Sequence, residues 1–138
     1  MDRTLAILKP DCTRRKLTGK AIDFILEKGF KIKAIRTLTL KKEEAEAFYA
    51  VHRGKPFFND LTSYMTSGPI FAMVLEKQNC VEDFRKVIGH TDPKKAENGT
   101  LRKLYGINIQ ENFVHGSDSE ENANKEIAFF FPLIEIIT

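Results

Sequence analysis

The stretch that decides the fold is Asn112-Phe113-Val114-His115-Gly116-Ser117-Asp118-Ser119, because the chain changes there from an extended segment to a helix. The apolar pair before His115 favours a strand, and the glycine after it allows a sharp turn. Ser119 precedes an acidic first turn and Ser117 stands three residues before Glu120, both of which are typical of a helix N-terminus. We therefore expect a last strand that ends on a histidine, close to backbone N–H groups that favour phosphate.

Three apolar segments upstream of this stretch predict further strands. Thr4–Leu8 and Ile70–Leu75 are continuous apolar runs, which favour strands buried on both faces. From Phe30 to Leu40 the apolar residues fall on alternate positions, which indicates a strand with one buried face. Because Lys9 follows the first run directly, we expect its side chain at a fixed position at the end of that strand.

Helical patterns separate these strands. Thr18 can cap a helix that Gly29 ends, and a helix with one apolar face stops at Gly89. The polar stretch from His90 to Thr100 has little periodicity, and long ordered loops of this kind are usually functional. Further helices are expected at 43–52, at 59–66 and from about 120 onward. The order of elements is βαββαβ with extra helices, a split βαβ arrangement of the α/β (α+β) class.

Composition limits the chain to one domain, residues 1–138. With 42% hydrophobic and 30% charged residues, 138 residues suit one core, and no apolar run approaches the roughly 18 to 20 residues of a membrane helix. The start, Met1-Asp2-Arg3, lacks the layout of a signal peptide, so we expect a cytoplasmic protein without a membrane partner. Cys12 and Cys80 form no paired motif and are expected to be free thiols.

Charge and motif content narrow the possible ligands. The net charge of +3 is spread along the chain and does not support nucleic-acid binding, and the basic cluster Arg14–Lys16 is assigned no function. Neither common glycine-rich phosphate motif occurs, so a nucleotide would have to be bound by scattered side chains. The candidates are cations for phosphate and flat or apolar side chains for a base: Lys9, Arg85, Arg102, Tyr49, Phe57 and Leu61.

Five segments together resemble the nucleoside diphosphate kinase family, in the family's order and at its spacing. They are Thr4–Asp11, Gly54–Phe58, Met65–Pro69, Gly99–Arg102 and Asn112–Ser119. The resemblance covers about residues 3–131. It implies a ferredoxin-like βαββαβ fold with a four-stranded antiparallel sheet. It also implies an enzyme that moves the γ-phosphoryl group of a nucleoside triphosphate to a nucleoside diphosphate, by a ping-pong mechanism through a phosphohistidine at His115.

The same resemblance implies roles for individual residues. Around His115, Tyr49 would stand beside the transferring phosphoryl group, and Ser117 and Glu126 would orient the imidazole. The residues expected to bind the nucleotide fall into three sets: Phe57, Leu61 and Ile109 for the base, Lys9 and Asn112 for the sugar, and Arg85, Thr91 and Arg102 for the phosphates. Mg²⁺ would arrive on the nucleotide phosphates, because no cluster of carboxylates suggests a metal site in the protein.

Histidine suits this chemistry for a physical reason. An imidazole has an ordinary pKa of about 6.5, so near neutral pH it has a lone pair that can attack phosphorus.

Three alternatives stay open: phosphorylation of Ser117 instead, transfer of the phosphoryl group to another protein, and a non-catalytic binding role. Members of the family it resembles assemble into oligomers, and the apolar tail 132–138 would otherwise expose a hydrophobic surface. We therefore expect a homo-hexamer or homo-tetramer. Asp92, where the family usually has Asn, would either weaken phosphate binding or cap a turn.

Overall fold

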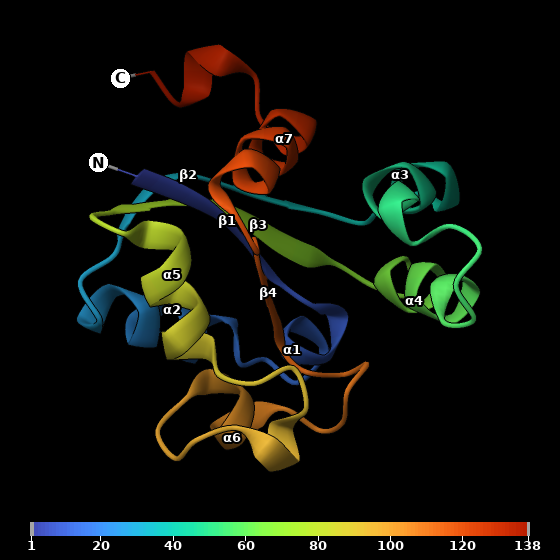
Figure 1. Cartoon of the computed structure of the whole chain (residues 1–138), viewed down its shortest axis with the longest axis horizontal. Coiled ribbons are helices and arrows are strands. Elements are labelled where there is room, and N and C mark those ends of the chain that lie inside the picture. The colour runs from blue at the N-terminus through green and yellow to red at the C-terminus, as the bar shows by residue number, and fades with distance from the viewer. Residues whose placement is uncertain (1, 138) are drawn as a thin grey trace.

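A four-stranded antiparallel sheet forms the centre of the computed structural model, which describes residues 2–137 (Figure 1). The strands are β1 (Asp2–Leu8), β2 (Lys31–Leu38), β3 (Ile70–Lys77) and β4 (Val114–Gly116). Their order across the sheet is β2-β3-β1-β4, and each neighbouring pair is antiparallel. With α2 (Thr18–Glu27) between β1 and β2, and α5 (Cys80–Ile88) between β3 and β4, this confirms the predicted βαββαβ fold.

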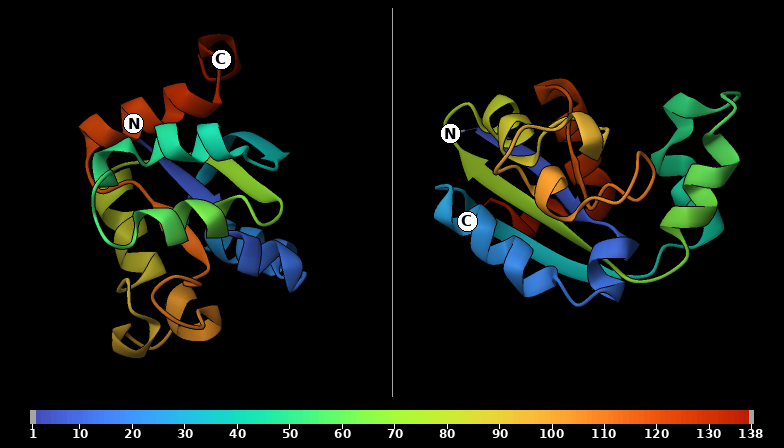
Figure 2. Two further views of the ribbon diagram at one scale, coloured as in Figure 1. Left: turned by 90° about the vertical axis from the view of Figure 1, so that its right-hand side faces the viewer. Right: turned by 90° about the horizontal axis from the view of Figure 1, so that it is seen from below.

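The sheet has an apolar layer on each face, as the continuous apolar runs predict. Leu5 and Ile7 belong to one layer, while Ala6 and Leu8 belong to the other, and all four are fully buried. Helices α3 (Lys42–Phe48), α4 (Phe58–Met65) and α7 (Glu120–Phe130) contribute to the first layer, and α2 and α5 to the second (Figure 2). Burying each large aliphatic side chain contributes about 1.5–3 kcal/mol, so the central strands are the most firmly held part of the molecule.

Strand β2 departs from the predicted alternation. A register shift between Ile32 and Ala34 interrupts its pairing with β3. Ile32 consequently packs against the α2–α5 layer, whereas Ala34 and Leu38 pack against the α3–α4–α7 layer. The expectation of one buried face along the whole strand was wrong, because an extra residue in a strand reverses the facing of everything after it.

Several short helices lie between the main elements. They are α1 (Pro10–Arg14), η1 (Ala50–His52), η2 (Pro93–Lys95), α6 (Leu101–Tyr105) and η3 (Leu133–Glu135). The sequence patterns did not predict α1 or α6. The helix expected at 43–52 is two elements, α3 and η1, with Tyr49 between them. Asp92 caps η2 by accepting a hydrogen bond from the Lys94 amide, so the turn-capping alternative for this residue is confirmed.

The helix ends agree with the sequence in part. Ser119 caps α7 by accepting a hydrogen bond from the Asn122 amide at 3.1 Å, as an acidic first turn after serine indicates. Gly29 has φ +93° after α2, as expected of a stop residue. Thr18 is the first residue of α2 and not its cap; Leu17 occupies that position without a side-chain cap.

Gly116 is needed for a different reason from the one expected. A Cβ atom there would lie 2.9 Å from a ring carbon of Phe84 in α5, so the glycine permits close packing of β4 on that helix. Cys12 and Cys80 are buried free thiols. Within residues 2–137, every helix is too short or too polar to cross a membrane.

Candidate active site

His115 lies on β4, directly opposite Ile7 of β1 in the antiparallel register. This pairing places it on the sheet face that carries α3, α4 and α7, because paired residues of adjacent strands share a face. The imidazole meets the ring of Phe48 edge-on, with centroids 5.7 Å apart. About a fifth of its side chain remains exposed. The imidazole is therefore supported by the sheet and open to a small ligand.

A carboxylate on α7 fixes the imidazole. Oε1 of Glu126 lies 2.8 Å from Nε2 of His115, and Oγ of Ser117 donates to the same oxygen at 2.8 Å. The Leu5 amide donates in turn to Oγ of Ser117 at 3.2 Å, so the serine is held from β1. Because an ionised carboxylate only accepts hydrogen bonds, Nε2 carries the proton and Nδ1 keeps its lone pair. The predicted group of His115, Ser117 and Glu126 is thus brought together in space.

A short chain of hydrogen bonds joins Lys9 to the loop after α5. Nζ of Lys9 donates to Oδ1 of Asn112 at 2.7 Å, and Nδ2 of Asn112 donates to the carbonyl of Thr91 at 3.0 Å. Lys9 and Asn112 are both buried. Burial lowers the pKa of Lys9 to about 7, with a further lowering by Arg102 and an opposing effect of Asp11. A buried ammonium in this position gains strongly from a nearby anion.

Arg102 is pinned between two backbone segments. Its two terminal nitrogens donate to the carbonyls of Gly89 at 2.9 Å and of Val114 at 2.8 Å. Its Nε is buried and has no hydrogen-bond partner among the described residues. Burial, followed by the charge of Arg85, lowers the pKa of Arg102 to about 10. A guanidinium with an unused donor, beside a second cation, suits an anionic ligand.

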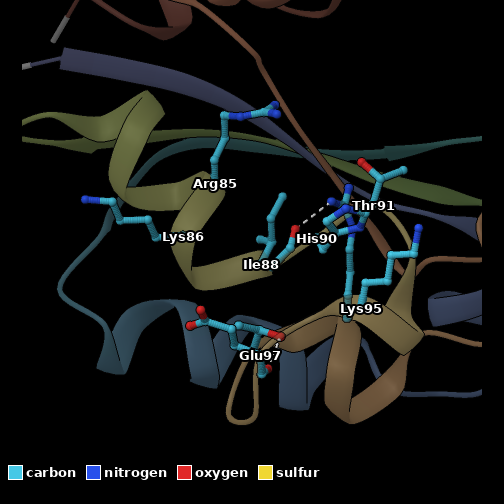
Figure 3. Close-up of a pocket in the computed structure, with 10 residues that line it drawn as sticks. Arg85, Lys86, Ile88, His90, Thr91, Lys95 and Glu97 are labelled. Atoms are coloured by element: carbon cyan, nitrogen blue, oxygen red, sulfur yellow. Dashed lines mark hydrogen bonds between the residues drawn. The ribbon is translucent and has the colours of Figure 1, made fainter.

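A cavity of about 510 Å³ brings together the three residues expected to contact phosphates, Arg85, Thr91 and Arg102 (Figure 3). Arg85 and Thr91 are exposed at its rim, and Arg102 is buried in its wall. Lys86 and Lys95 also line this cavity, and Glu97 is the one carboxylate among the described residues that line it. The balance of charge in the cavity favours an anion.

The residues expected to bind a base are in a different environment. Phe57 precedes α4 and is 47% exposed, Leu61 lies on α4 and is half-buried, and Ile109 is 61% exposed in the loop before β4. The α3–α4 hairpin projects from the sheet, and Figure 2 shows the loop before β4 extending toward it. Lys55 lies over the Phe57 ring at 5.9 Å from its centroid. The prediction that Phe57, Leu61 and Ile109 form one slot remains a prediction.

Tyr49 is buried close to the His115 side of the sheet. Its ring meets Phe48 edge-on at 4.9 Å, and Phe48 in turn contacts His115. Its hydroxyl is buried without a hydrogen-bond partner among residues 2–137. Burial and then the charge of Glu126 raise the pKa of Tyr49 above its usual range, so the phenol stays protonated and is a ready donor.

The backbone before His115 contains a strained turn that the sequence did not reveal. Phe113 has φ +79°, and the Val114 amide donates to the Asn112 carbonyl at 2.9 Å, which is the pattern of a γ-turn with positive φ. The carbonyl of Phe113 accepts from the Lys9 amide at 2.9 Å. The turn thereby places Asn112 beside Lys9 while the chain enters β4.

Two aromatic neighbours of the site were also missed. Phe48, which contacts His115, was assigned only to a helix, and its position directly before Tyr49 is the one available signal. His52, which was not among the predicted site residues, stacks on Tyr49 at 6.3 Å and meets Phe57 edge-on at 5.2 Å. Within residues 2–137 no group of three or more His, Cys, Asp or Glu side chains is placed to hold a metal ion.

Comparison with known proteins identifies the family. The sequence profile of nucleoside diphosphate kinase matches residues 2–136. The nucleoside diphosphate kinases of Persephonella marina and Salinibacter ruber are each 53% identical to this chain over 99% of its length, and the matches cover 98% and 96% of those proteins. Among solved structures, the Aquifex aeolicus nucleoside diphosphate kinase superposes with a TM-score of 0.95 at 40% identity, covering 99% of both chains. The Halobacterium salinarum enzyme in complex with CDP gives 0.94 at 38% identity, covering 99% of this chain and 91% of that one. This chain belongs to the nucleoside diphosphate kinase family.

Proposed function

We propose that this chain catalyses the family's phosphoryl transfer through Nδ1 of His115. The observation that carries the proposal is the contact of Nε2 with Glu126 at 2.8 Å, because it leaves the lone pair on the other ring nitrogen. In the first half-reaction, Nδ1 attacks the γ-phosphorus of a nucleoside triphosphate. The bond to the β–γ bridging oxygen breaks, and the nucleoside diphosphate leaves with that electron pair. In the second, a terminal β-phosphate oxygen of another diphosphate takes the phosphoryl group from the histidine.

Ser117 is a poor alternative acceptor. It is fully buried, and its hydroxyl already donates to Glu126 and accepts from the Leu5 amide. A phosphoryl group on Oγ would displace both interactions and bring a second negative charge to the carboxylate. We therefore assign Ser117 the role of orienting Glu126.

The buried cations supply charge neutralisation. Arg102 and Lys9 are held by hydrogen bonds before any ligand binds, so they need little rearrangement as charge develops on the phosphate oxygens. Phosphate would also raise the pKa of Lys9 from about 7, so binding the nucleotide would bring a proton to this amine. Arg85 and Thr91, at the rim of the cavity, would contact the phosphates nearer solvent.

The base half of the site would accept any common base. Phe57 offers an exposed ring for stacking, and Leu61 and Ile109 add apolar surface, none of which distinguishes base edges. Lys9 and Asn112 would hold the sugar hydroxyls. A family member 38% identical to this chain has been solved in complex with CDP, which supports nucleotide binding by this chain.

Mg²⁺ would be held mainly by the nucleotide phosphates. Mg²⁺ prefers phosphate and water oxygens and keeps several of its waters, so a nucleoside triphosphate can bring the ion with it. When bound, it would neutralise phosphate charge alongside the protein cations.

We also propose a homo-hexamer or homo-tetramer in the cytoplasm. The support for assembly is the tail, where Leu133, Ile134 and Ile137 are 68%, 75% and 63% exposed. Exposed apolar side chains gathered in one segment favour association. Light scattering at micromolar concentration would give the mass, and a monomer would contradict the proposal.

Labelling with γ-labelled ATP and Mg²⁺ tests the chemistry. The wild type should retain acid-labile, alkali-stable label and release it as GTP on addition of GDP. His115→Ala should retain none, whereas the control Arg3→Gln, which removes a part-exposed ion pair with Glu76 away from the cavity, should label normally. Acid-stable label on a serine would refute the assignment of His115.

A further inference from the structure

The short helix α1 connects the two sides of the nucleotide site. Its Asp11 is fully buried, and the hydroxyl of Tyr64 on α4 donates to Oδ1 of Asp11. The same hydroxyl accepts from the Asp11 amide at 3.0 Å. Burial, and then the hydrogen bond to Asp11, raise the pKa of Tyr64 above its usual range, so this donor stays protonated. The N-terminus of α1 is thereby fastened to α4.

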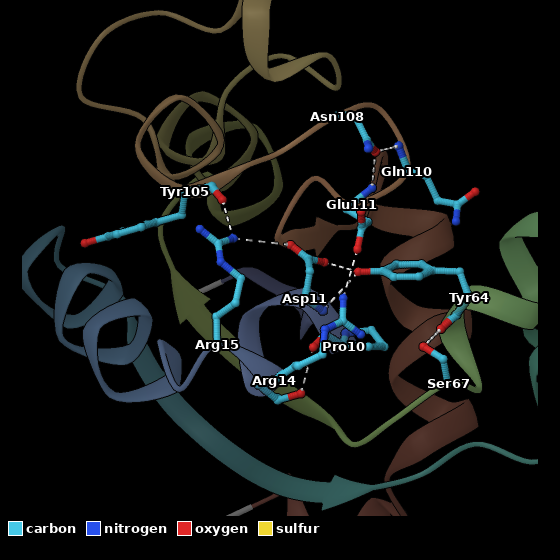
Figure 4. A network of polar contacts seen from close by, with 11 residues as sticks. Pro10, Asp11, Arg14, Arg15, Tyr64, Ser67, Tyr105, Asn108, Gln110 and Glu111 are labelled. Atoms are coloured by element: carbon cyan, nitrogen blue, oxygen red, sulfur yellow. Dashed lines mark hydrogen bonds and ion pairs between the residues drawn. The ribbon is translucent and has the colours of Figure 1, made fainter.

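The same helix also holds the loop before β4. Arg14 forms an ion pair with Glu111 at 2.8 Å, and NH1 of Arg15 donates to the carbonyl of Tyr105 at 2.7 Å. NH1 of Arg15 also lies 4.0 Å from Oδ2 of Asp11, which has no hydrogen-bond partner among the described residues. Figure 4 shows Asp11 between Tyr64 on one side and Arg15 on the other. The carboxylate of Asp11 therefore links the anchor of α4 to the anchor of the loop.

The loop itself is closed by its own hydrogen bonds. Oδ1 of Asn108 accepts from the amides of Gln110 and Glu111 at 3.0 and 2.7 Å, and the Ile107 amide donates to the Glu111 carbonyl at 2.8 Å. Because these hydrogen bonds hold the loop together, its contacts at Tyr105 and Glu111 also fix the position of the exposed Ile109 between them. On the other side, Leu61 lies one helical turn before Tyr64 on α4.

From this arrangement we propose that Asp11, Arg14, Arg15 and Tyr64 are positioning residues that set the distance between α4 and the loop 105–111, and hence the affinity for the nucleotide. The inference rests on the proposed function, since it takes Leu61 and Ile109 as opposite walls of the base slot. None of the four residues touches the reacting atoms. Loosening them should weaken nucleotide binding for every base while the chemistry at His115 continues.

The test compares two pairs of arginine variants with a matched control. Arg14→Gln/Arg15→Gln releases the loop, Arg14→Lys/Arg15→Lys keeps both charges, and Arg3→Gln removes a part-exposed ion pair with Glu76 elsewhere on the sheet. We expect the glutamine pair to raise KM for ADP and GDP alike by about 5- to 20-fold with kcat within about twofold, and the lysine pair to recover most of the loss. Arg3→Gln should leave both constants unchanged. Tyr64→Phe should reproduce the KM effect from the α4 side, at a larger cost in stability because it leaves the buried Asp11 carboxylate short of a donor.

A donor without a base separates this inference from the proposed function. Phosphoramidate can phosphorylate a reactive histidine directly, so its labelling of His115 should be the same in wild type and the glutamine pair. Calorimetry of ADP binding should meanwhile show the loss of affinity. If the variants only lower the unfolding temperature and leave KM and ADP affinity unchanged, or if phosphoramidate labelling falls in parallel, the positioning role is refuted. If wild-type His115 takes no label from either donor while ADP still binds, the proposed function fails, and the affinity measurement alone decides the role of α1.

Discussion

The two halves of the proposed nucleotide site are built in opposite ways. The polar half consists of Lys9 after β1, Arg102 on α6 and Asn112 before β4. All three are buried, and each side chain is held by at least one hydrogen bond of 2.7–3.0 Å. The base half, Phe57, Leu61 and Ile109, lies on a projecting hairpin and a loop, and two of its three side chains are largely exposed. Directional contacts need fixed positions, whereas stacking tolerates small displacements. With the assignments proposed above, the molecule would combine fixed phosphate-binding groups with tolerance for different bases.

The polar half is held at a cost in stability. Lys9 is buried beside the like charge of Arg102, and burial has lowered the pKa of both groups. Two more polar atoms, the hydroxyl of Tyr49 and Nε of Arg102, are buried without partners among the residues that the structure describes. A phosphate bound beside them would supply the missing hydrogen-bond partners.

The largest effect on activity is expected from replacing a buried cation of the polar half. Lys9→Met keeps the length of the side chain and removes the charge, so kcat/KM for ADP should fall by about 10²- to 10³-fold. The matched control is Lys86→Met, which removes an exposed lysine from the rim of the same cavity and should cost less than about threefold. Steady-state kinetics at saturating ATP would measure both. Equal losses of kcat/KM in the two variants would mean that the burial of Lys9 and its hydrogen bond to Asn112 contribute nothing to catalysis.

The pH dependence of stability should report the same lysine. The pKa of Lys9 is about 7 in the folded chain, against 10.5 for an unperturbed lysine, so between these values the unfolded chain binds more protons at this site. The free energy of unfolding of the ligand-free protein should therefore rise with pH, relative to Lys9→Met, by about 2 kcal/mol between about pH 7 and about pH 8.5. Urea unfolding of both proteins at several pH values measures the difference, in which other titrating groups cancel. Parallel stability curves would show that Lys9 is charged normally.

Glu126→Gln should separate orientation from charge. The amide is nearly the same size but presents an NH₂ group as well as an oxygen, so it no longer selects the tautomer with a free Nδ1. We expect kcat to fall by about 10- to 100-fold with KM for ADP nearly unchanged. The exposed pair Lys125 and Glu121 on the same helix provides a control, because Glu121→Gln removes a carboxylate away from His115. A large change in KM instead would place Glu126 in substrate binding.

The smallest effect is expected in the base half. Phe57→Ala should raise KM by about tenfold, and by similar factors for ADP, GDP and CDP, because each base loses the same stacking surface. Measuring kcat/KM for the three diphosphates gives the result. A thousandfold preference of the wild type for one base would contradict the base-tolerant slot.

A dideoxy substrate tests the polar half without changing the contacts of the base half. With 2′,3′-dideoxy-ADP the base half is fully occupied, but Lys9 and Asn112 lose the sugar hydroxyls that we expect them to bind. Its kcat/KM should therefore lag that of ADP by more than Phe57→Ala costs. If the dideoxy substrate kept pace with ADP, the assignment of Lys9 and Asn112 to the sugar would be wrong.

Much of this architecture was predictable, and the exceptions have physical causes. Thr4–Leu8 and Ile70–Leu75 were correctly predicted as central strands, because a strand that is buried on both faces has apolar residues at consecutive positions. The bulge in β2 was not predictable, since its two halves show the same spacing and differ only in the face they present. Helices α1 and α6 have five residues each, too few for a helical period to be recognised.

The site divides in the same way. The grouping of His115, Ser117 and Glu126 followed from the resemblance to the family, and the structure places them within hydrogen-bonding distance. The link between Asp11 and Tyr64 joins residues 53 positions apart, and no local pattern records such a contact. The position of the Lys9 side chain likewise depends on contacts distant in sequence, since its amide donates to the Phe113 carbonyl and its Nζ donates to Asn112.

The turn at Phe113 limits how this protein can be made more stable. A residue other than glycine at φ +79° costs about 1–3 kcal/mol, and here the fully buried ring, stacked on Tyr105 at 5.0 Å, holds the backbone in place. Phe113→Gly would relieve the backbone but empty a core position, at a loss of about 3–5 kcal/mol. Mutations that instead relax this turn would gain stability while moving Asn112 away from Lys9. Substitutions that relax the turn at position 113 are therefore expected to raise thermal stability and to lower catalytic turnover.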